Sequence, residues 1–169
     1  MDIKALKTYY DGEYPEIKTL IGNKADIKLL AKAYSSCGSE TTAVLQYIFQ
    51  HYVADDKDIK EVLLGLSINE MKHHELLGEA IVSLGGVPYY TNGNMSNYNT
   101  KCVYEGLNLV KMLEQDLVDE KAGVEYYEYI KTKLSSDSLK NLIDRIILDE
   151  MVHIDTLGKM LEYITIYKE

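Results

Sequence analysis

A glutamate-histidine pattern that occurs twice constrains this chain more than any other feature of its sequence. Glu70 and His73 are three positions apart, and Glu150 and His153 repeat that spacing eighty residues later. On a helix, residues three apart project from one face, with Cβ atoms about 5 to 6 Å from each other. Each pair is therefore able to bind one metal ion, and two pairs predict a metal site.

Each pair also follows a glutamate that lies thirty residues upstream, Glu40 in the first half and Glu120 in the second. The same shift of eighty residues aligns Tyr47 with Tyr127. The two halves thus carry the same three ligand types in one register, and we interpret them as internal repeats.

The spacing of apolar residues predicts an all-α chain of four long helices in a single domain. We expect a lead-in without assigned chemistry at 1–23, a first helix pair at 24–85, a crossover at 86–101 and a second helix pair at 102–169. The first helix is expected to run from about Lys24 to Ala54. The fourth is expected to begin near Ser136 or Asp137, which are good capping residues.

The crossover is rich in Gly, Asn, Tyr and Thr and shows no sustained helical or strand period. Fully extended, its residues reach roughly 55 Å, whereas a helix of the expected length measures roughly 42 Å. It is therefore long enough to run the length of a helix bundle.

Composition excludes several classes of protein. The net charge is -9 and the basic residues are scattered, which argues against a nucleic acid partner. No segment reaches the roughly 18 apolar residues that span a bilayer, and the polar start lacks a signal-peptide core, so we expect a cytoplasmic protein with no membrane partner. Cys37 and Cys102 stand far apart without a CxxC motif, and we expect reduced, buried thiols.

Four glutamates on inward-facing stripes need compensation, because a buried carboxylate costs several kcal/mol even after relaxation. Two divalent cations would cancel the charge of four ionised glutamates and two neutral histidines. Oxygen-rich ligation with one imidazole per metal suits iron or manganese rather than structural zinc. The residues therefore favour a dinuclear centre.

At these residues the chain resembles the ferritin-like superfamily, and the bacterioferritin and rubrerythrin branches most of all. The segments ETTAVLQY, SINEMKHHELL and ILDEMVHIDTL look like the metal-binding helices of bacterioferritins. The resemblance covers roughly residues 30–162. It implies a ferritin-like four-helix bundle with a long crossover between helices 2 and 3, and a cofactor of two iron ions, or alternatively two manganese ions.

The resemblance also implies that each half supplies the ligands of one metal. The six ligands, through which the metals would act in catalysis, would be Glu40, Glu70, His73, Glu120, Glu150 and His153. Glu70 and Glu150 would bridge the two metals, and the glutamates upstream of them would be terminal ligands.

Further residues near the ligands have implied roles. Asp116 lies one turn before Glu120, where bacterioferritins place an aspartate that accepts a hydrogen bond from a ligand histidine. Tyr47 and Tyr127 each lie seven residues after a ligand glutamate. They are candidates for hydrogen bonding to carboxylates or for supplying an electron, although packing at a bundle edge is the more frequent role of tyrosine.

Met71 occupies the position that resembles the haem-binding methionine of bacterioferritins. Because Met151 has the same sequence context without an expected haem, packing is the more frequent explanation and a haem cofactor is not expected. His51 and His74 fall outside the repeat, and we expect ordinary surface or interface histidines.

These patterns predict a dinuclear non-haem iron or manganese oxidoreductase that reduces or disproportionates hydrogen peroxide. It would be rubrerythrin-like without a rubredoxin module, so that any electron donor would be a separate protein. Its partners would be hydrogen peroxide or dioxygen and, because only sixteen residues follow His153, a second copy in a homodimer rather than a cage. The alternatives are a ferritin or bacterioferritin-type ferroxidase that stores iron, and a metal-free helical interaction module.

Overall fold

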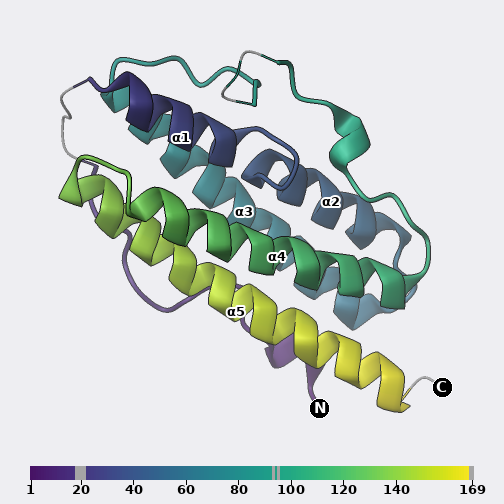
Figure 1. Cartoon of the computed structure of the whole chain (residues 1–169). Helices are drawn as coiled ribbons and strands as arrows, with labels where there is room; N and C mark the ends of the chain where they lie inside the picture. Colours follow the sequence, from purple (N-terminus) through teal and green to yellow (C-terminus); the bar gives the residue numbers. More distant parts are fainter. Residues whose placement is uncertain (18–21, 93, 95, 168–169) are drawn as a thin grey trace.

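The computed structural model describes residues 1–17, 22–92, 94 and 96–167, and within them the chain is helical (Figure 1). Its elements are η1 (Ile3–Ala5), α1 (Lys24–Tyr34), α2 (Glu40–Val53), α3 (Lys57–Ser83), η2 (Thr100–Cys102), α4 (Leu109–Lys131) and α5 (Asp137–Tyr167). Within these ranges the only β-pairing is one isolated bridge between Thr91 and Asn97. The predicted all-α bundle is confirmed.

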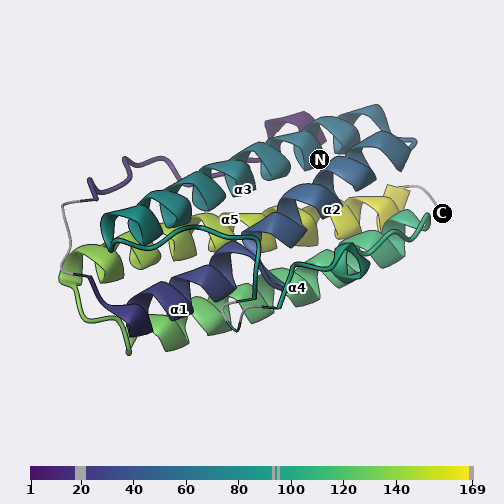
Figure 2. The ribbon, with the colours of Figure 1, turned by 90° about the horizontal axis from the view of Figure 1, so that it is seen from above.

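The helices are arranged as two antiparallel pairs, α2 with α3 and α4 with α5 (Figures 1 and 2). The long connection between α3 and α4 runs along the bundle beside α1 and α2, as expected of a crossover (Figure 2). It extends beyond the predicted range, because α4 begins only at Leu109. There the side chain of Asn108 caps the helix by accepting a hydrogen bond from the Lys111 amide at 3.0 Å.

The first helix differs from the prediction, because it is divided into α1 and α2. Hydroxyl groups in the intervening segment take over backbone carbonyls: Ser36 Oγ donates to the Lys32 carbonyl at 2.7 Å, and Ser39 Oγ donates to the Ser36 carbonyl at 2.6 Å. Gly38 has a φ of 69°, a conformation that glycine adopts without steric cost. Such local hydrogen bonds compete with the helix, which apolar spacing alone does not reveal.

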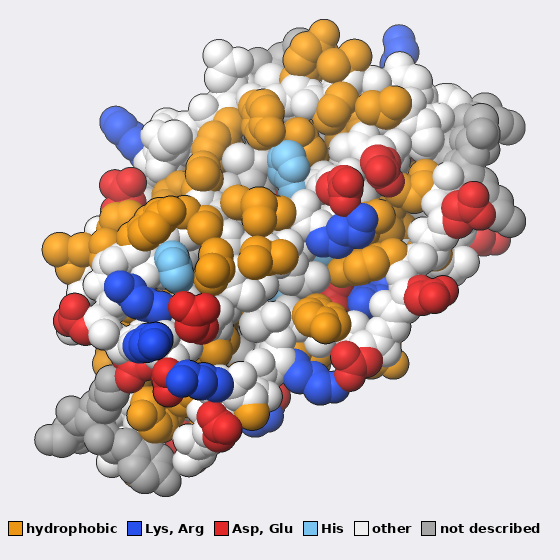
Figure 3. Space-filling model, turned by 180° about the vertical axis from the view of Figure 1, so that it is seen from behind, with side chains coloured by type: hydrophobic (Ala, Val, Ile, Leu, Met, Phe, Trp, Pro, Cys, Tyr) orange, Lys and Arg blue, Asp and Glu red, His pale blue; other side chains and the backbone are white. Residues whose placement is uncertain are grey.

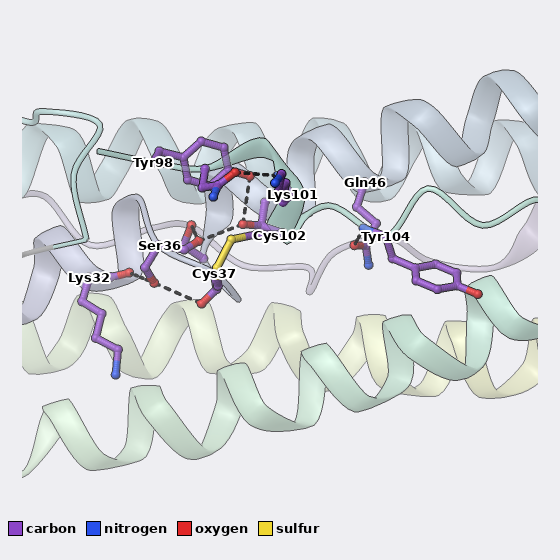
Figure 4. Close-up of a disulfide and its surroundings, with 11 residues drawn as sticks. Lys32, Ser36, Cys37, Gln46, Tyr98, Lys101, Cys102 and Tyr104 are labelled. Atoms are coloured by element: carbon purple, nitrogen blue, oxygen red, sulfur yellow. Dashed lines mark hydrogen bonds between the residues drawn. A yellow bond between two sulfur atoms is a disulfide. The ribbon is translucent and has the colours of Figure 1, made fainter. Parts of the chain in front are cut away.

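A disulfide joins Cys37 to Cys102, so the expectation of reduced, buried thiols is wrong (Figure 4). Cys37 lies exposed in the break before α2, and half-buried Cys102 ends η2 in the crossover. Further along the crossover, the amide of Tyr104 donates to Gln46 Oε1 on α2 at 2.8 Å (Figure 4). The crossover is thus attached both to the start of α2 and to its middle.

Two apolar clusters fill the bundle on either side of its centre. One includes Leu77 and Ile81 of α3 with Leu142 of α5, and the other includes Leu63 of α3 with Leu157 of α5. The sequence positions between them, on both helices, are those of the Glu-x-x-His pairs. None of the helices in the described ranges is both long and apolar enough to cross a membrane.

Candidate metal centre

The six predicted ligands come together at the centre of the bundle. Glu40 is the first residue of α2 and Glu120 lies within α4, while α3 and α5 each supply one Glu-x-x-His pair. All six side chains are buried, with at most 7% of each residue exposed. They form two groups whose ligand atoms lie within 4.8 Å of one another: one consists of Glu40, Glu70, His73 and Glu150, and the other of Glu70, Glu120, Glu150 and His153.

The two groups share Glu70 and Glu150, and each of these carboxylates turns one oxygen toward each histidine. Glu70 Oε2 lies 3.2 Å from His73 Nδ1, and its Oε1 lies 2.9 Å from His153 Nδ1. The Oε1 and Oε2 atoms of Glu150 lie 3.1 and 3.2 Å from the same two nitrogens. This arrangement is the one required of carboxylates that bridge two ions.

The other two glutamates each belong to one side only. Glu40 Oε2 lies 3.8 Å from His73 Nδ1, and Glu120 Oε1 lies 3.5 Å from His153 Nδ1. Each group thus consists of one terminal carboxylate, one imidazole and the two shared carboxylates.

Electrostatics distinguishes the terminal glutamates from the shared ones. Burial raises the pKa of Glu40 and Glu120 well above the ordinary value, and the charges of neighbouring glutamates add to the effect. Burial also acts to raise the pKa of Glu70, but hydrogen bonds with Glu40 and the facing histidines outweigh burial and leave this pKa well below the ordinary value. Burial and the Glu70 charge likewise act to raise the pKa of Glu150, but hydrogen bonds with Glu120 and the two histidines leave this pKa below its ordinary value.

For the two histidines, burial and the neighbouring charges act on the pKa in the opposite directions. Burial acts to lower the pKa of His73 and His153, but the surrounding carboxylates raise it well above the ordinary value. These raised pKa values favour the protonated forms of the histidines and terminal glutamates, and cations that bind here compete with those protons.

The donor set fits a pair of metal ions. Nε2 of His153 faces only acceptors, the Thr8 carbonyl at 3.0 Å and Asn69 Oδ1 at 2.8 Å, so in the neutral ring it carries the proton. Nδ1 then offers a lone pair toward Glu70 Oε1, 2.9 Å away, and neither buried atom has another partner there. Two acceptors at this distance need a metal ion or a proton between them. Four carboxylates and two imidazoles with this geometry suit two iron or manganese ions.

The two tyrosines of the repeat bond crosswise to the terminal glutamates. The hydroxyl of Tyr47 on α2 donates to Glu120 Oε1 on α4, and the hydroxyl of Tyr127 on α4 donates to Glu40 Oε1 on α2. Both tyrosines are buried, and burial raises the pKa of Tyr47 well above its ordinary value, with the Glu120 charge adding to it. The two hydroxyl hydrogen bonds fix the terminal carboxylates.

The hydrogen-bond partners of the histidines differ from the expectation for Asp116. Asp116 Oδ1 accepts from the amides of Gln46 and Gln50, both at 2.8 Å, and does not contact a histidine. His73 Nε2 instead donates to Asp149 Oδ2 at 2.9 Å. The outward nitrogens of both histidines already have other partners, Asp149 for His73, and Asn69 and the Thr8 carbonyl for His153, while Asp116 is bonded to α2.

Sequence reasoning missed Asp149 and Asn69, the partners of the two histidines. They are equivalent positions in the eighty-residue repeat, and each directly precedes a bridging-type glutamate. Each bonds the histidine of the opposite half, separated from it by 76 and 84 residues. The repeat was a usable signal, but it did not reveal that the contacts cross between the halves.

The N-terminal segment, to which no chemistry was assigned from its sequence, also supports the site. The amide of Tyr10 donates to Asp149 Oδ1 at 2.6 Å, and the hydroxyl of Tyr14 donates to Asp149 Oδ2 at 2.6 Å. Arg145 Nη1 lies 2.7 Å from the same carboxylate, and its Nη2 donates to the Tyr10 carbonyl at 2.8 Å. Burial acts to raise the pKa of Asp149, but the hydrogen bond from His73, together with Arg145, Tyr14 and the Tyr10 amide, holds this pKa below its ordinary value.

A small cavity of about 50 Å³ leads to the cluster between α2 and α4. It is lined by Glu40, Glu120 and Glu150 together with Ser39 and Gly123. This volume holds only a molecule of a few heavy atoms, because a single water needs about 10 to 15 Å³ on this measure.

The other candidate residues lie outside the cluster. Met71 is 46% exposed and lines a surface groove with His74 and Tyr90. The ring of His74 stacks on that of Tyr34 with centroids 4.0 Å apart, and His51 Nδ1 lies 2.8 Å from the Lys60 carbonyl. Both histidines have packing or hydrogen-bond contacts instead of a place among the ligands.

Comparison with known proteins agrees with this architecture. A bacterioferritin from Desulfovibrio desulfuricans is 32% identical over 146 residues, which span 80% of this chain and 76% of that protein. A probable manganese catalase from Clostridium acetobutylicum is 20% identical over 146 residues, which span 74% of this chain and 65% of that protein. The crystal structure of KatB, a manganese catalase from Anabaena, has a TM-score of 0.84 at 19% identity and covers 93% of this chain and 81% of that one.

The family match covers most of the helical chain. Residues 30–166 match the family described as Ferritin-like domain, a range that contains both Glu-x-x-His pairs and both upstream glutamates. The chain therefore belongs to the ferritin-like family.

Proposed function

We propose that this protein is a dinuclear manganese or iron oxidoreductase that disproportionates or reduces hydrogen peroxide. The observation that carries the proposal is the buried, two-sided cluster in which Glu70 and Glu150 each face both histidines. The six predicted residues would hold the two ions. A redox-active metal pair would supply the capacity to exchange two electrons with one peroxide.

The chain's own groups would prepare the site for that chemistry. Tyr47 and Tyr127 donate hydrogen bonds to the terminal carboxylates and line the cavity together with them. Asp149 and Asn69 orient the histidines so that Nδ1 points inward. The apolar clusters on both sides limit water to the cavity.

The cavity supports a small substrate such as peroxide. A Cβ placed on Gly123 meets no atom within 4 Å, so this glycine leaves the entrance open. Replacing Gly123 with leucine should fill the cavity and slow peroxide consumption at least tenfold while two ions still bind. Gly158→Leu is the matched control, because Gly158 has equal space on α5 but does not line the cavity.

Disproportionation is the simpler of the two peroxide reactions for this chain, because it needs no electron donor. The similarity to two manganese catalases supports it. Reduction of peroxide would require electrons from a separate donor protein. Oxygen evolution from peroxide by the manganese-loaded protein, measured with an oxygen electrode, is expected. Peroxide consumption by the iron form only with an added reductant would instead identify a peroxidase.

The second candidate is iron oxidation and storage, which the 32% identity to a bacterioferritin favours. Stopped-flow oxidation of the anaerobically reduced iron form by peroxide and by dioxygen separates the two. A faster reaction with dioxygen, followed by continuing turnover of added ferrous iron, would reject the peroxide proposal.

A homodimer is the proposed assembly. Apolar side chains gather on the face of the molecule shown in Figure 3, and α2 and α3 expose Leu45, Ile68 and Met71. Light scattering should give a mass near two chains. An assembly near twenty-four chains would favour storage, and a haem absorbance band in the purified protein would make Met71 a haem ligand.

A further inference from the structure

The hydrogen bonds behind the two histidines form one connected chain. His153 Nε2 donates to Asn69 Oδ1 at 2.8 Å, and Asn69 Nδ2 donates to the Tyr14 hydroxyl at 3.0 Å. Tyr14 in turn donates to Asp149 Oδ2 at 2.6 Å, and His73 Nε2 donates to the same oxygen at 2.9 Å. One carboxylate therefore ends the hydrogen bonds of both halves.

The amide at position 69 gives this chain its direction. Asn69 both accepts a hydrogen bond and donates one, whereas an ionised carboxylate only accepts. The single proton of the Tyr14 hydroxyl already goes to Asp149, so an acceptor at position 69 would find no donor there. The amide is 7% exposed and therefore depends on these partners rather than on water.

The two histidines consequently have partners of different charge. His73 donates directly to a carboxylate, which Arg145 and the Tyr10 amide hold in place. His153 donates to two neutral acceptors, the amide oxygen of Asn69 and the Thr8 carbonyl. Arg145 shares the charge of Asp149 and moderates the difference, but it does not reverse it.

We propose that this difference makes the two metal positions unequal, so that the position formed with His73 binds its ion more tightly and fills first. A carboxylate that accepts a hydrogen bond from a ligand histidine makes the ring a stronger donor to the metal, and such partners change metal affinity by about 10- to 100-fold. Asn69 and Asp149 are thus positioning residues for otherwise equivalent ligand sets. The inference rests on the dinuclear site proposed above.

Titration of the metal-free protein with Mn²⁺ under anaerobic conditions tests the inference. Calorimetry should resolve two binding steps whose dissociation constants differ by about tenfold or more. Electron paramagnetic resonance should show an isolated Mn²⁺ signal at one equivalent and a coupled signal at two. Crystals grown with one equivalent should give an anomalous peak beside His73. Two equal constants, or a first ion beside His153, would overturn the inference.

Exchange of the two partners provides a sharper test. Asn69→Asp should tighten the second step and bring the two constants within about threefold, and Asp149→Asn should weaken the first step by about tenfold. Tyr14→Phe is the matched control, because it interrupts the chain but leaves each histidine its direct partner, and the order of filling should persist. An unchanged ratio of constants in folded Asn69→Asp protein contradicts the inference.

The inequality of the two metal positions can still be tested if the variants do not fold. An extra buried carboxylate in Asn69→Asp, or an unpaired Arg145 in Asp149→Asn, is costly, so circular dichroism accompanies each titration. If both variants unfold, the parent titration and its anomalous map decide. Binding of fewer than two ions by the parent protein would reject the dinuclear function itself, whereas two ions of equal affinity would reject only the inequality.

Discussion

The two halves of the bundle carry the same ligands but support them differently. Glu40 begins α2 directly after a break that Gly38, serine hydroxyls and the disulfide stabilise. Glu120 lies inside the uninterrupted helix α4. A terminal ligand at the start of a helix depends on contacts with other parts of the chain, whereas one in mid-helix is fixed by the helix itself.

The outer face of the site shows a second difference. Gly65 and Arg145 are equivalent positions in the repeat. A Cβ on Gly65 would lie 2.8 Å from Thr8 Cγ2, so this glycine lets the N-terminal segment pack against α3. Arg145 instead binds that segment through the carbonyls of Tyr10 and Gly12, both at 2.8 Å. The ligands of the two halves are alike because each metal needs the same donor atoms. The residues behind the ligands differ because they need only hold the ligands in position.

The largest expected effect tests what the halves share. Replacing Glu70 or Glu150 with alanine should abolish binding of both ions and reduce peroxide turnover at least a thousandfold, because each carboxylate faces both histidines. Elemental analysis and oxygen evolution measure the two outcomes. Glu79→Gln, an exposed position on α3, serves as the control. Retention of one full equivalent of metal by both variants would show that neither glutamate bridges.

The disulfide tests a support that only the first half has. Cys37→Ser with Cys102→Ser should lower the free energy of unfolding by about 2 to 4 kcal/mol, because the bond closes a long loop in the unfolded chain. Chemical denaturation in oxidising buffer measures the loss. The parent protein under reducing conditions should match the variant, and equal stability of all samples would contradict a structural role.

Asp116 should give a smaller, pH-dependent effect in the second half. Burial raises its pKa to about 7, while hydrogen bonds from Gln50 and Gln46 oppose burial. The folded state then binds more protons than the unfolded state between pH about 4 and about 7, so this group lowers stability as pH rises through that window, and the loss is complete above it. Asp116→Asn should remove about 2 kcal/mol of this loss between pH 5 and 8.

Urea denaturation of the metal-free parent and of the Asp116→Asn variant at both pH values measures that difference. Asp119→Asn is the control, because Asp119 also accepts a hydrogen bond from Gln46, at 3.1 Å, but is not fully buried. A variant whose stability falls with pH as steeply as that of the parent would contradict a raised pKa for Asp116.

The smallest expected effect compares the crosswise tyrosines. Tyr47→Phe and Tyr127→Phe each remove one hydroxyl from one terminal glutamate and should slow peroxide turnover by about tenfold, or about 1.4 kcal/mol. Steady-state kinetics of the metal-loaded variants gives the ratio. Tyr126→Phe, on the same helix as Tyr127 but bonded to the Leu29 carbonyl, is the control. Strongly unequal losses of turnover in the two variants would show that the two hydroxyls are not equivalent.

Much of the fold and the ligand pattern could be predicted because both depend on local spacing. Apolar residues three or four apart predicted the helices, the capping residues Ser136 and Asp137 predicted the start of α5 closely, and the three-residue spacing placed each histidine beside its glutamate. The break after Tyr34 was not predicted, because the hydroxyls that replace helical hydrogen bonds do not disturb the apolar period.

The sequence by itself determined the helix pairs and the two Glu-x-x-His faces, since residues three apart on a helix meet whatever surrounds them. Only the tertiary structure decided which residues support them. Tyr14 and Asp149 are 135 residues apart, and Tyr127 and Glu40 are 87 apart. Contacts over such distances depend on how the two halves pack against each other and on where the N-terminal segment lies, and no local period records either.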